Sequence, residues 1–263
     1  MAKLSLSKAW DETREAIARD GKLIGAVALA MFFLPGVIVG VIEPVASPFP
    51  ATTKEAVIAI LVALIALVGQ LALIRMALGA RPTVGEAIGH GARRVPAYIA
   101  AGIIWAGPLI VAAYFIGPDF WRHPQNATGG QAAAALVIML ALLIIGVRMM
   151  MTSSVASAEA VGPIEIVRRS WQLTSGHWWK LFGLLCVFLL VMIIVMTAVG
   201  AVIGILSSLV FGPLEPMTIG ALFTAVCTQL VSAVLTTGLL IMLARIYVQL
   251  SGRSSASVPS SGT

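Results

Sequence analysis

The densest group of basic and aromatic side chains in this sequence lies between positions 168 and 180. Its members are Arg168, Arg169, Trp171, Trp178, Trp179 and Lys180. Arginine and lysine attract anionic lipid headgroups, and tryptophan is enriched where lipid tails meet water. This stretch is therefore a candidate contact for lipid headgroups or for a partner protein. In an alternative interpretation, Arg168 and Arg169 pair with Glu159 or Glu165 and only fix the segment against the rest of the chain.

Three further arginines recur at similar places in the sequence. Arg75, Arg148 and Arg245 each stand at the end of a long apolar run. Such a side chain can reach from an apolar helix to the membrane interface and anchor it there. A ring of headgroup contacts, completed by Arg168 and Arg169, is the second interpretation.

Uncharged polar residues occur inside the apolar runs. The candidates for helix packing or for a polar path are Thr224, Thr228, Ser232, Thr236, Gln229 and Gln70. The four hydroxyl residues recur every four positions and so share one face of a helix. Small residues allow membrane helices to pack closely, as do the pairs Gly36/Gly40 and Gly200/Gly204. A polar path through the membrane is the alternative.

No familiar catalytic or metal-binding motif is present in the sequence. His90, His123 and His177 fall in different predicted loops, and zinc needs three or four converging ligands. No HExxH, CxxC, GxSxG or phosphate-binding glycine loop occurs. We therefore expect no catalytic residues, no metal and no cofactor. An intramembrane enzyme with an unfamiliar set of residues is the alternative left open.

Composition indicates which kind of fold must position these side chains. Of 263 residues, 59% are hydrophobic and 11% are charged, whereas an ordinary soluble domain has about 25% charged residues. The mean hydropathy is +1.01. These values exclude a soluble enzyme, a nucleic-acid-binding module and a disordered chain. They predict an all-α, polytopic membrane protein.

Six uncharged runs are long enough to cross a bilayer, which takes about 20 residues in a helix. The predicted spans are 23–42, 56–78, 97–117, 132–151, 181–205 and 219–244. They form one membrane domain, residues 1–250, followed by a Ser-rich tail at 251–263.

The distribution of Lys and Arg predicts the orientation of these spans. Of the 17 basic residues, all but Lys54 and Arg122 fall on one side of the predicted membrane. Because basic loops stay in the cytoplasm, both termini are predicted to be cytoplasmic, in a bacterial inner membrane. The net charge of +6 is then mostly a signal of topology and does not imply nucleic acid.

The chain also has the features of an internal repeat. Lys22-Leu23-Ile24-Gly25 and Lys180-Leu181-Phe182-Gly183 begin two spans alike, and Ile99-Ala100-Ala101-Gly102 is a weaker copy. Each of three units would join a cytoplasmic amphipathic helix to a membrane hairpin. In the third unit, Gly162-Pro163 suits the start of that helix and Gly176 its end.

The stretch from Glu165 to Lys180 resembles a recurrent bacterial signature. It is similar to the glycerophosphoryl diester phosphodiesterase membrane domain and to related uncharacterised six-helix inner-membrane proteins. The match is carried by Arg169-Ser170-Trp171, Leu173-Thr174 and Gly176, and more faintly by 84–88. The resemblance implies a six-helix membrane fold and, in some members, a fused phosphodiesterase domain. No residues outside the spans of this chain would supply that catalytic domain.

Together these features favour a non-enzymatic integral membrane protein, a scaffold or accessory partner that contacts lipid. Its expected partners are membrane lipids and another membrane protein. The alternative is a transporter or channel for a small or lipid-like molecule. Ion coupling is not expected, because Glu43, Glu55, Arg75 and Arg148 all lie at span ends.

Overall fold

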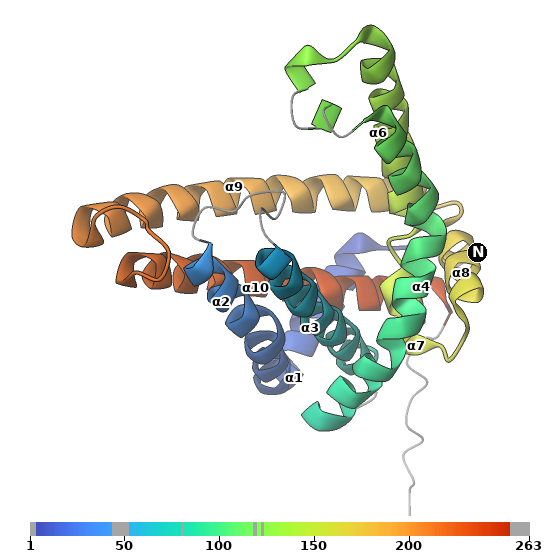
Figure 1. The fold of residues 1–263 in the computed structure, drawn as a ribbon. Helices are drawn as coiled ribbons and strands as arrows, with labels where there is room; N and C mark the ends of the chain where they lie inside the picture. The colour runs from blue at the N-terminus through green and yellow to red at the C-terminus, as the bar shows by residue number, and fades with distance from the viewer. Residues whose placement is uncertain (1–3, 44–52, 80–81, 118–119, 122–123, 253–263) are drawn as a thin grey trace, which may run out of the picture.

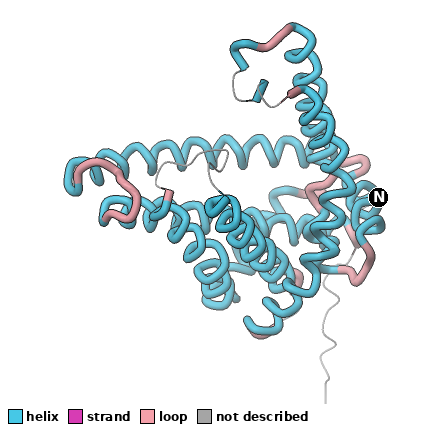
Figure 2. The backbone as a smooth tube through the Cα atoms, viewed as in Figure 1, coloured by secondary structure: helices cyan, strands magenta, loops and turns pink. Residues whose placement is uncertain are grey.

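The computed structural model describes residues 4–43, 53–79, 82–117, 120–121 and 124–252 (Figure 1). Within these residues the chain consists of helices and loops, without a strand (Figure 2). The elements are α1 (Leu6–Ala28), the π-helical turn η1 (Leu29–Phe33), α2 (Leu34–Ile42), α3 (Thr53–Ala77), α4 (Val84–Ile116), the 3₁₀ turn η2 (Pro124–Asn126), α6 (Gly129–Arg148), α7 (Thr152–Ala158), α8 (Pro163–Thr174), α9 (Trp178–Phe211) and α10 (Ile219–Leu250).

Six helical segments of the described chain are long and apolar enough to cross a membrane. They are Leu6–Ile42, Thr53–Ala77, Val84–Ile116, Gly129–Ala158, Trp178–Phe211 and Ile219–Leu250. The predicted all-α, polytopic membrane fold is confirmed. Each predicted span overlaps one of these segments, and the spans 56–78 and 97–117 extend one residue past Ala77 and Ile116. Residues 253–263 of the predicted tail lie outside the described residues.

Pro35 explains a local widening of the first long segment. Proline has no N–H, and its ring collides with the carbonyl group four residues earlier in a regular helix. The turn before Pro35 is η1, and the N–H of Leu34 donates to the carbonyl oxygen of Leu29, five residues earlier. This one-residue insertion lets the helix continue past the proline, so that α1, η1 and α2 are continuous.

The predicted amphipathic segments are arranged differently in the three repeat units. In the first two units they are not separate helices, because α1 and α4 run from the segment into the span without a break. In the third unit, Gly162 precedes α8, Pro163 is its first residue, and Gly176 follows it with φ +84°. Positive φ at a glycine is a common way to end a helix. The boundaries of α8 are therefore those that the sequence predicts, and the three-unit repeat stays a prediction.

The packed core lies at one end of the bundle. This basic end, as we call it, is where α3, α6 and α10 finish and where α4 and α9 begin. Residues 71–74 of α3 and 240–244 of α10 are buried there. Away from the basic end the helices diverge, and α6 leans away from α9 and α10 (Figure 1). Only Ala135 and Val147 of α6 are buried.

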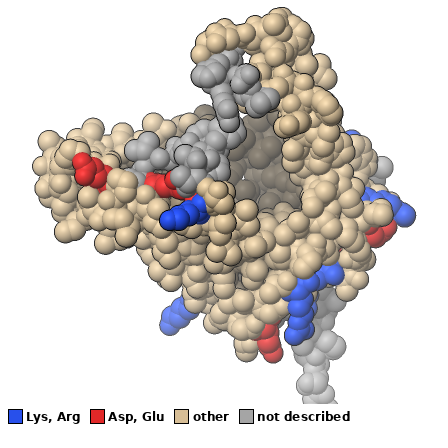
Figure 3. Space-filling model, viewed as in Figure 1, with Lys and Arg blue, Asp and Glu red and all other residues tan. Residues whose placement is uncertain are grey.

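The surface left by this divergence is apolar. Figure 3 shows few charged side chains on the visible face, and a hollow beside the outer half of α4. Large hydrophobic residues such as Phe115, Val137 and Leu209 are exposed on α4, α6 and α9. In water such a surface would aggregate, whereas in a bilayer it faces lipid tails.

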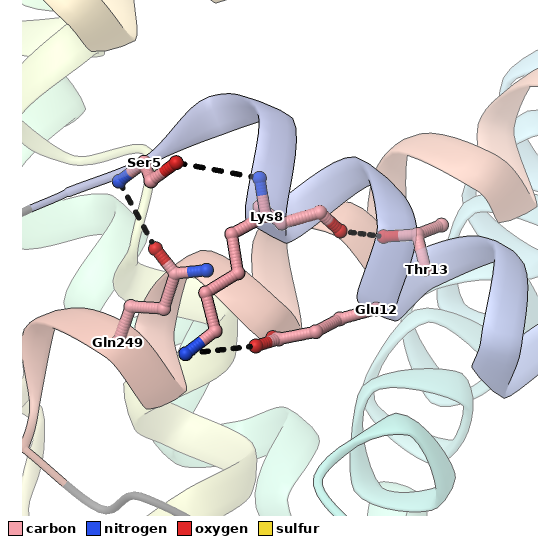
Figure 4. A network of polar contacts seen from close by, with 6 residues as sticks. Ser5, Lys8, Glu12, Thr13 and Gln249 are labelled. Atoms are coloured by element: carbon pink, nitrogen blue, oxygen red, sulfur yellow. Dashed lines mark hydrogen bonds and ion pairs between the residues drawn. The ribbon is translucent and has the colours of Figure 1, made fainter.

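The chain's first described residues are fixed to its last helix. The backbone N–H of Ser5 donates to Oε1 of Gln249 at 3.2 Å, and the Ser5 hydroxyl caps α1 by accepting from the N–H of Lys8 (Figure 4). Lys8 in turn forms an ion pair with Glu12. Leu4 is buried in the same core. These contacts hold the start of α1 against the end of α10.

Two neighbouring glycines of α4 test how closely α3 and α4 pack. A Cβ atom at Gly91 would lie 2.5 Å from the carbonyl oxygen of Val68, whereas one at Gly89 would meet nothing within 4 Å. Gly91→Ala should therefore lower the free energy of unfolding by about 1–3 kcal/mol through overpacking. Gly89→Ala should leave it unchanged or raise it by up to about 1 kcal/mol. Thermal unfolding in detergent measures both, and equal effects would contradict this packing.

Candidate functional site

A short polar helix, α7, is buried at the basic end. Residues 152–157, which include Thr152, Ser153, Ser154 and Ser157, are all buried, although four of the six carry hydroxyl groups. Burying a hydroxyl group is costly unless it forms a hydrogen bond. The Ser157 hydroxyl donates to the carbonyl oxygen of Leu71 in α3 at 2.9 Å, and the Thr152 hydroxyl donates to that of Met149. Among the described residues, Ser154 Oγ has no hydrogen-bond partner.

Two side chains of α4 satisfy the carbonyl end of α7. The last four carbonyl groups of a helix have no partner within the helix. Arg94 Nε donates to the carbonyl oxygen of Ala156 at 2.8 Å, and His90 Nε2 lies 2.9 Å from that of Ser157. Because a carbonyl oxygen only accepts, His90 Nε2 must carry the hydrogen. His90 and Arg94 are four residues apart and therefore share one face of α4.

Arg94 also holds the loop that follows α7. Its Nη2 atom donates to the carbonyl oxygens of Glu159 and, at 3.0 Å, of Val161. A positive side chain at the carbonyl end of a helix is further stabilised by the helix dipole. One guanidinium group thereby joins α4 to both α7 and the α7–α8 loop.

The side chain of Glu159 links two more helices to this cluster. Its Oε1 atom accepts from the Tyr247 hydroxyl of α10 at 2.6 Å and lies 3.5 Å from Arg169 Nε of α8. The Glu159 side chain is only 13% exposed, whereas the Arg169 side chain is 41% exposed, so solvent partly screens the ion pair from the arginine side. We call the set His90, Arg94, Ser157, Glu159, Arg169 and Tyr247 the polar hub.

The helix α8 has one packed face and one free face. Ile166, Ser170 and Thr174 are buried, and the hydroxyl groups of Ser170 and Thr174 donate to the carbonyl oxygen of Arg148, the last residue of α6. On the opposite side, an apolar groove of about 440 Å³ is lined by Ile104, Ile164, Val167, Arg168, Trp171 and Gln172. Ile164 is 74% exposed. One face of α8 therefore packs against the protein, and the other lines an open groove.

The structure divides the six predicted contact residues into two groups. Three make contacts within the protein: Arg169 with Glu159, Trp178 Nε1 with the carbonyl oxygen of Ile144 at 3.3 Å, and Lys180 Nζ with that of Leu4 at 3.1 Å. Lys180 is nevertheless exposed, as are the other three residues. Side-chain exposure of Arg168 is 67%, and Trp171 and Trp179 are 47% and 77% exposed. Arg168 lies 3.7 Å from Glu165 on its own helix, in contact with solvent.

The three predicted anchor arginines have different neighbours. The guanidinium carbon of Arg148 lies 5.1 Å from the ring centre of Trp171, within the range of a cation–π interaction. Arg245 lies within electrostatic reach of Glu12 and Glu15 of α1. Arg75 is half-buried at the end of α3. The ring of headgroup contacts stays a prediction.

Some of the predicted polar residues of the spans form contacts within the protein, and others line a cavity. Thr228 donates to the carbonyl oxygen of Thr224 in its own helix, and Gln70 Nε2 lies 3.5 Å from the Tyr98 hydroxyl. Gln229, Ser232 and Thr236 line a cavity of about 280 Å³ between η1, α2, α3 and α10. Helix packing and a polar path both stay predictions for this set of residues.

Small residues bring α2 and α10 together beside this cavity. A Cβ atom at Gly36 would lie 2.4 Å from Gln229 Oε1, and one at Gly40 would lie 2.9 Å from Ala225 Cβ. The predicted close seam at Gly36 and Gly40 is therefore present. At Gly200 and Gly204 of α9, a Cβ atom would meet nothing within 4 Å among the described residues, so the described chain forms no such seam there.

Most of the polar hub was missed by reasoning from the sequence. His90 is predicted to lie in a loop, whereas the structure places it with Arg94 on α4, and nothing local in the sequence indicates that a buried helix more than 60 residues further on ends there. Glu159 was considered only as a partner of the arginines. In the described part of the chain, no group of three or more His, Cys, Asp or Glu side chains could hold a metal ion.

The fold and the polar hub define a polytopic α-helical membrane protein whose helices are joined at one end by buried polar contacts. The chain belongs to the family described as Domain of unknown function (DUF7847), whose model matches residues 4–250. No curated protein and no solved structure matches the chain. The resemblance to the glycerophosphoryl diester phosphodiesterase membrane domain is not confirmed by this match.

Two adjacent arginines of α4 test the polar hub. Arg94→Gln should lower the free energy of unfolding by about 2 kcal/mol or more, because it leaves buried carbonyl groups without their charged donor. Arg93→Gln, at an exposed neighbouring position, should change it by less than about 0.5 kcal/mol. Thermal unfolding of both variants in the same detergent gives the comparison. Similar stabilities would show that the contacts of Arg94 do not hold the hub together.

Proposed function

We propose that this protein is a non-enzymatic integral protein of a bacterial inner membrane, a scaffold or accessory partner that contacts anionic lipid through the free face of α8. The observation that carries the proposal is the division of α8 into a buried polar face and an exposed apolar, aromatic and basic face. An amphipathic helix of this kind lies in the interfacial plane of a membrane.

The position of the free face supports lipid as its occupant. The groove beside Trp171 includes Ile104, which belongs to the long apolar helix α4. It is therefore continuous with surface that faces lipid tails. Arg168 stands at its edge with its charge exposed, and Trp179 is exposed at the start of α9. Apolar residues beside a basic one match an acyl chain beside an anionic headgroup.

The buried contacts support a scaffold in which α8 is held rigidly. Arg169, Ser170 and Thr174 fix its inner face to α7, α6 and the polar hub. A rigid platform at the interface could also present lipid or the free face to a second membrane protein. The partner would then share the surface around Trp171 and Arg168.

Adjacent arginines of α8 should respond differently to the same substitution. Arg168→Gln should weaken retention of phosphatidylglycerol about fivefold, which corresponds to about 1 kcal/mol for one interfacial basic residue, with stability unchanged. Arg169→Gln should leave retention unchanged and lower the thermal transition, because it removes a partner of the buried Glu159 carboxylate. Native mass spectrometry after release from discs of phosphatidylglycerol and phosphatidylethanolamine measures retention. Unchanged retention in Arg168→Gln would count against the lipid contact.

The proposed orientation has both termini in the cytoplasm, supported by the excess of Lys and Arg on the side of the basic end. Reporter fusions at either terminus should therefore report the cytoplasm, and a fusion within 118–131 should report the opposite side. A periplasmic signal from the C-terminal fusion would contradict this orientation.

A further inference from the structure

A cavity inside the membrane region has the composition of a binding site for a neutral molecule. It has a volume of about 280 Å³ and lies between η1, α2, α3 and α10. Met31, Phe32, Val39, Val62 and two alanines give it mostly apolar walls, and Gln229, Ser232 and Thr236 supply its polar groups. None of the described residues that line it has an ionisable side chain.

The depth of the cavity places it in the hydrocarbon core of a bilayer. Gln229 is ten residues from the start of α10, so it lies about 15 Å along a helix that crosses a core roughly 30 Å thick. Water is scarce at this depth, and a polar group without a partner is costly there. In the described chain, the side chains of Gln229, Ser232 and Thr236 form no hydrogen bond to protein. They are available to a ligand.

Backbone features of the neighbouring helices open this space. The π-helical turn η1 supplies Met31 and Phe32 to the cavity, and such turns occur frequently at functional sites. Gly69 of α3 accommodates the widened turn, since a Cβ atom there would lie 2.5 Å from Met31 Cβ. Gly36 similarly makes room for the amide of Gln229. The glycines and the π turn together shape the walls.

We propose that this cavity binds a neutral lipid-like molecule whose polar end is a hydroxyl or carbonyl group, held by Gln229, Ser232 and Thr236. The amide and the hydroxyl groups can both donate and accept, which suits either polar end. A charged headgroup is disfavoured, because none of the described residues that line the cavity carries an opposite charge to offset its desolvation. The proposal does not depend on the surface of α8.

Photolabelling of the full-length protein in liposomes tests this assignment. The probes are three diazirine-bearing molecules with the same sixteen-carbon chain, ending in a hydroxyl, a carboxylate or a methyl group. The alcohol should label peptides of α2, α3 and α10 in a saturable way. The acid and the hydrocarbon should label them at least about fivefold less, since they lack a neutral hydrogen-bonding end. Equal labelling by all three probes, or no saturable labelling by the alcohol, would overturn the proposal.

A matched pair of variants tests whether the labelling occurs in the cavity. Ala66→Phe fills the space, whereas Ala63→Phe makes the same change on the exposed face of α3. Labelling by the alcohol should disappear in Ala66→Phe and persist in Ala63→Phe. Equal labelling in the two would overturn the assignment.

A second variant keeps the test valid if Ala66→Phe destabilises the fold. Gln229→Leu removes the amide without adding bulk, and it should reduce labelling by the alcohol about fivefold while leaving the weak labelling by the hydrocarbon unchanged. The thermal transition is measured for every variant. If Gln229→Leu retains full labelling, the amide does not hold the ligand and the proposal fails. Retention of phosphatidylglycerol should be unaffected, which separates this site from the surface of α8.

Discussion

The arrangement of the basic end depends on one constraint, the need to satisfy the polar groups of a buried helix. The carbonyl end of α7 would be unpaired without Arg94 and His90, and its hydroxyl groups need acceptors in neighbouring helices. Because Arg94 reaches α7 from α4, and Glu159 binds Tyr247 of α10, satisfying these groups fixes three separate parts of the chain. Helices in lipid gain little from hydrophobic association, so such contacts matter more there than in water.

The same constraint decides which basic and aromatic residues are free. Arg169 is paired with the carboxylate of Glu159, and Lys180 donates to the carbonyl oxygen of Leu4, so both have a partner within the protein although each remains partly open to solvent. Arg168 and Trp171 lie on the face of α8 that packing leaves uncovered. A rigid helix with one free interfacial face can contact lipid without rearrangement. The proposed scaffold function rests on this combination of a packed face and an uncovered face on α8.

In the middle of the bundle, the helices are held by close packing rather than by buried polar contacts. There the helices diverge, and close approach occurs only where a glycine permits it, as at Gly36 and Gly69. The π turn before Pro35 supplies Met31 and Phe32 to the wall of the cavity, which Gln229 also lines. The residues that allow these helices to approach closely therefore also shape the cavity.

Much of this protein could be derived from its sequence. Six spans and the all-α fold follow from the length of the uncharged runs, because a chain in a bilayer must satisfy its backbone within each helix. The ends of α8 follow from Gly162, Pro163 and Gly176, whose backbone preferences are local. The seam at Gly36 and Gly40 was also predicted from small residues at helical spacing.

The polar hub and the cavity were decided only by the tertiary structure. Arg93 and Arg94 are alike in sequence, yet one is exposed and the other donates to carbonyl groups more than 60 residues away. Arg168 and Arg169 differ in the same manner, because adjacent residues of a helix point about 100° apart and meet different neighbours. Local sequence determines that a residue is on a helix and which residues share its face. Only the packing of distant helices determines whether that face meets lipid, water or a buried carbonyl group.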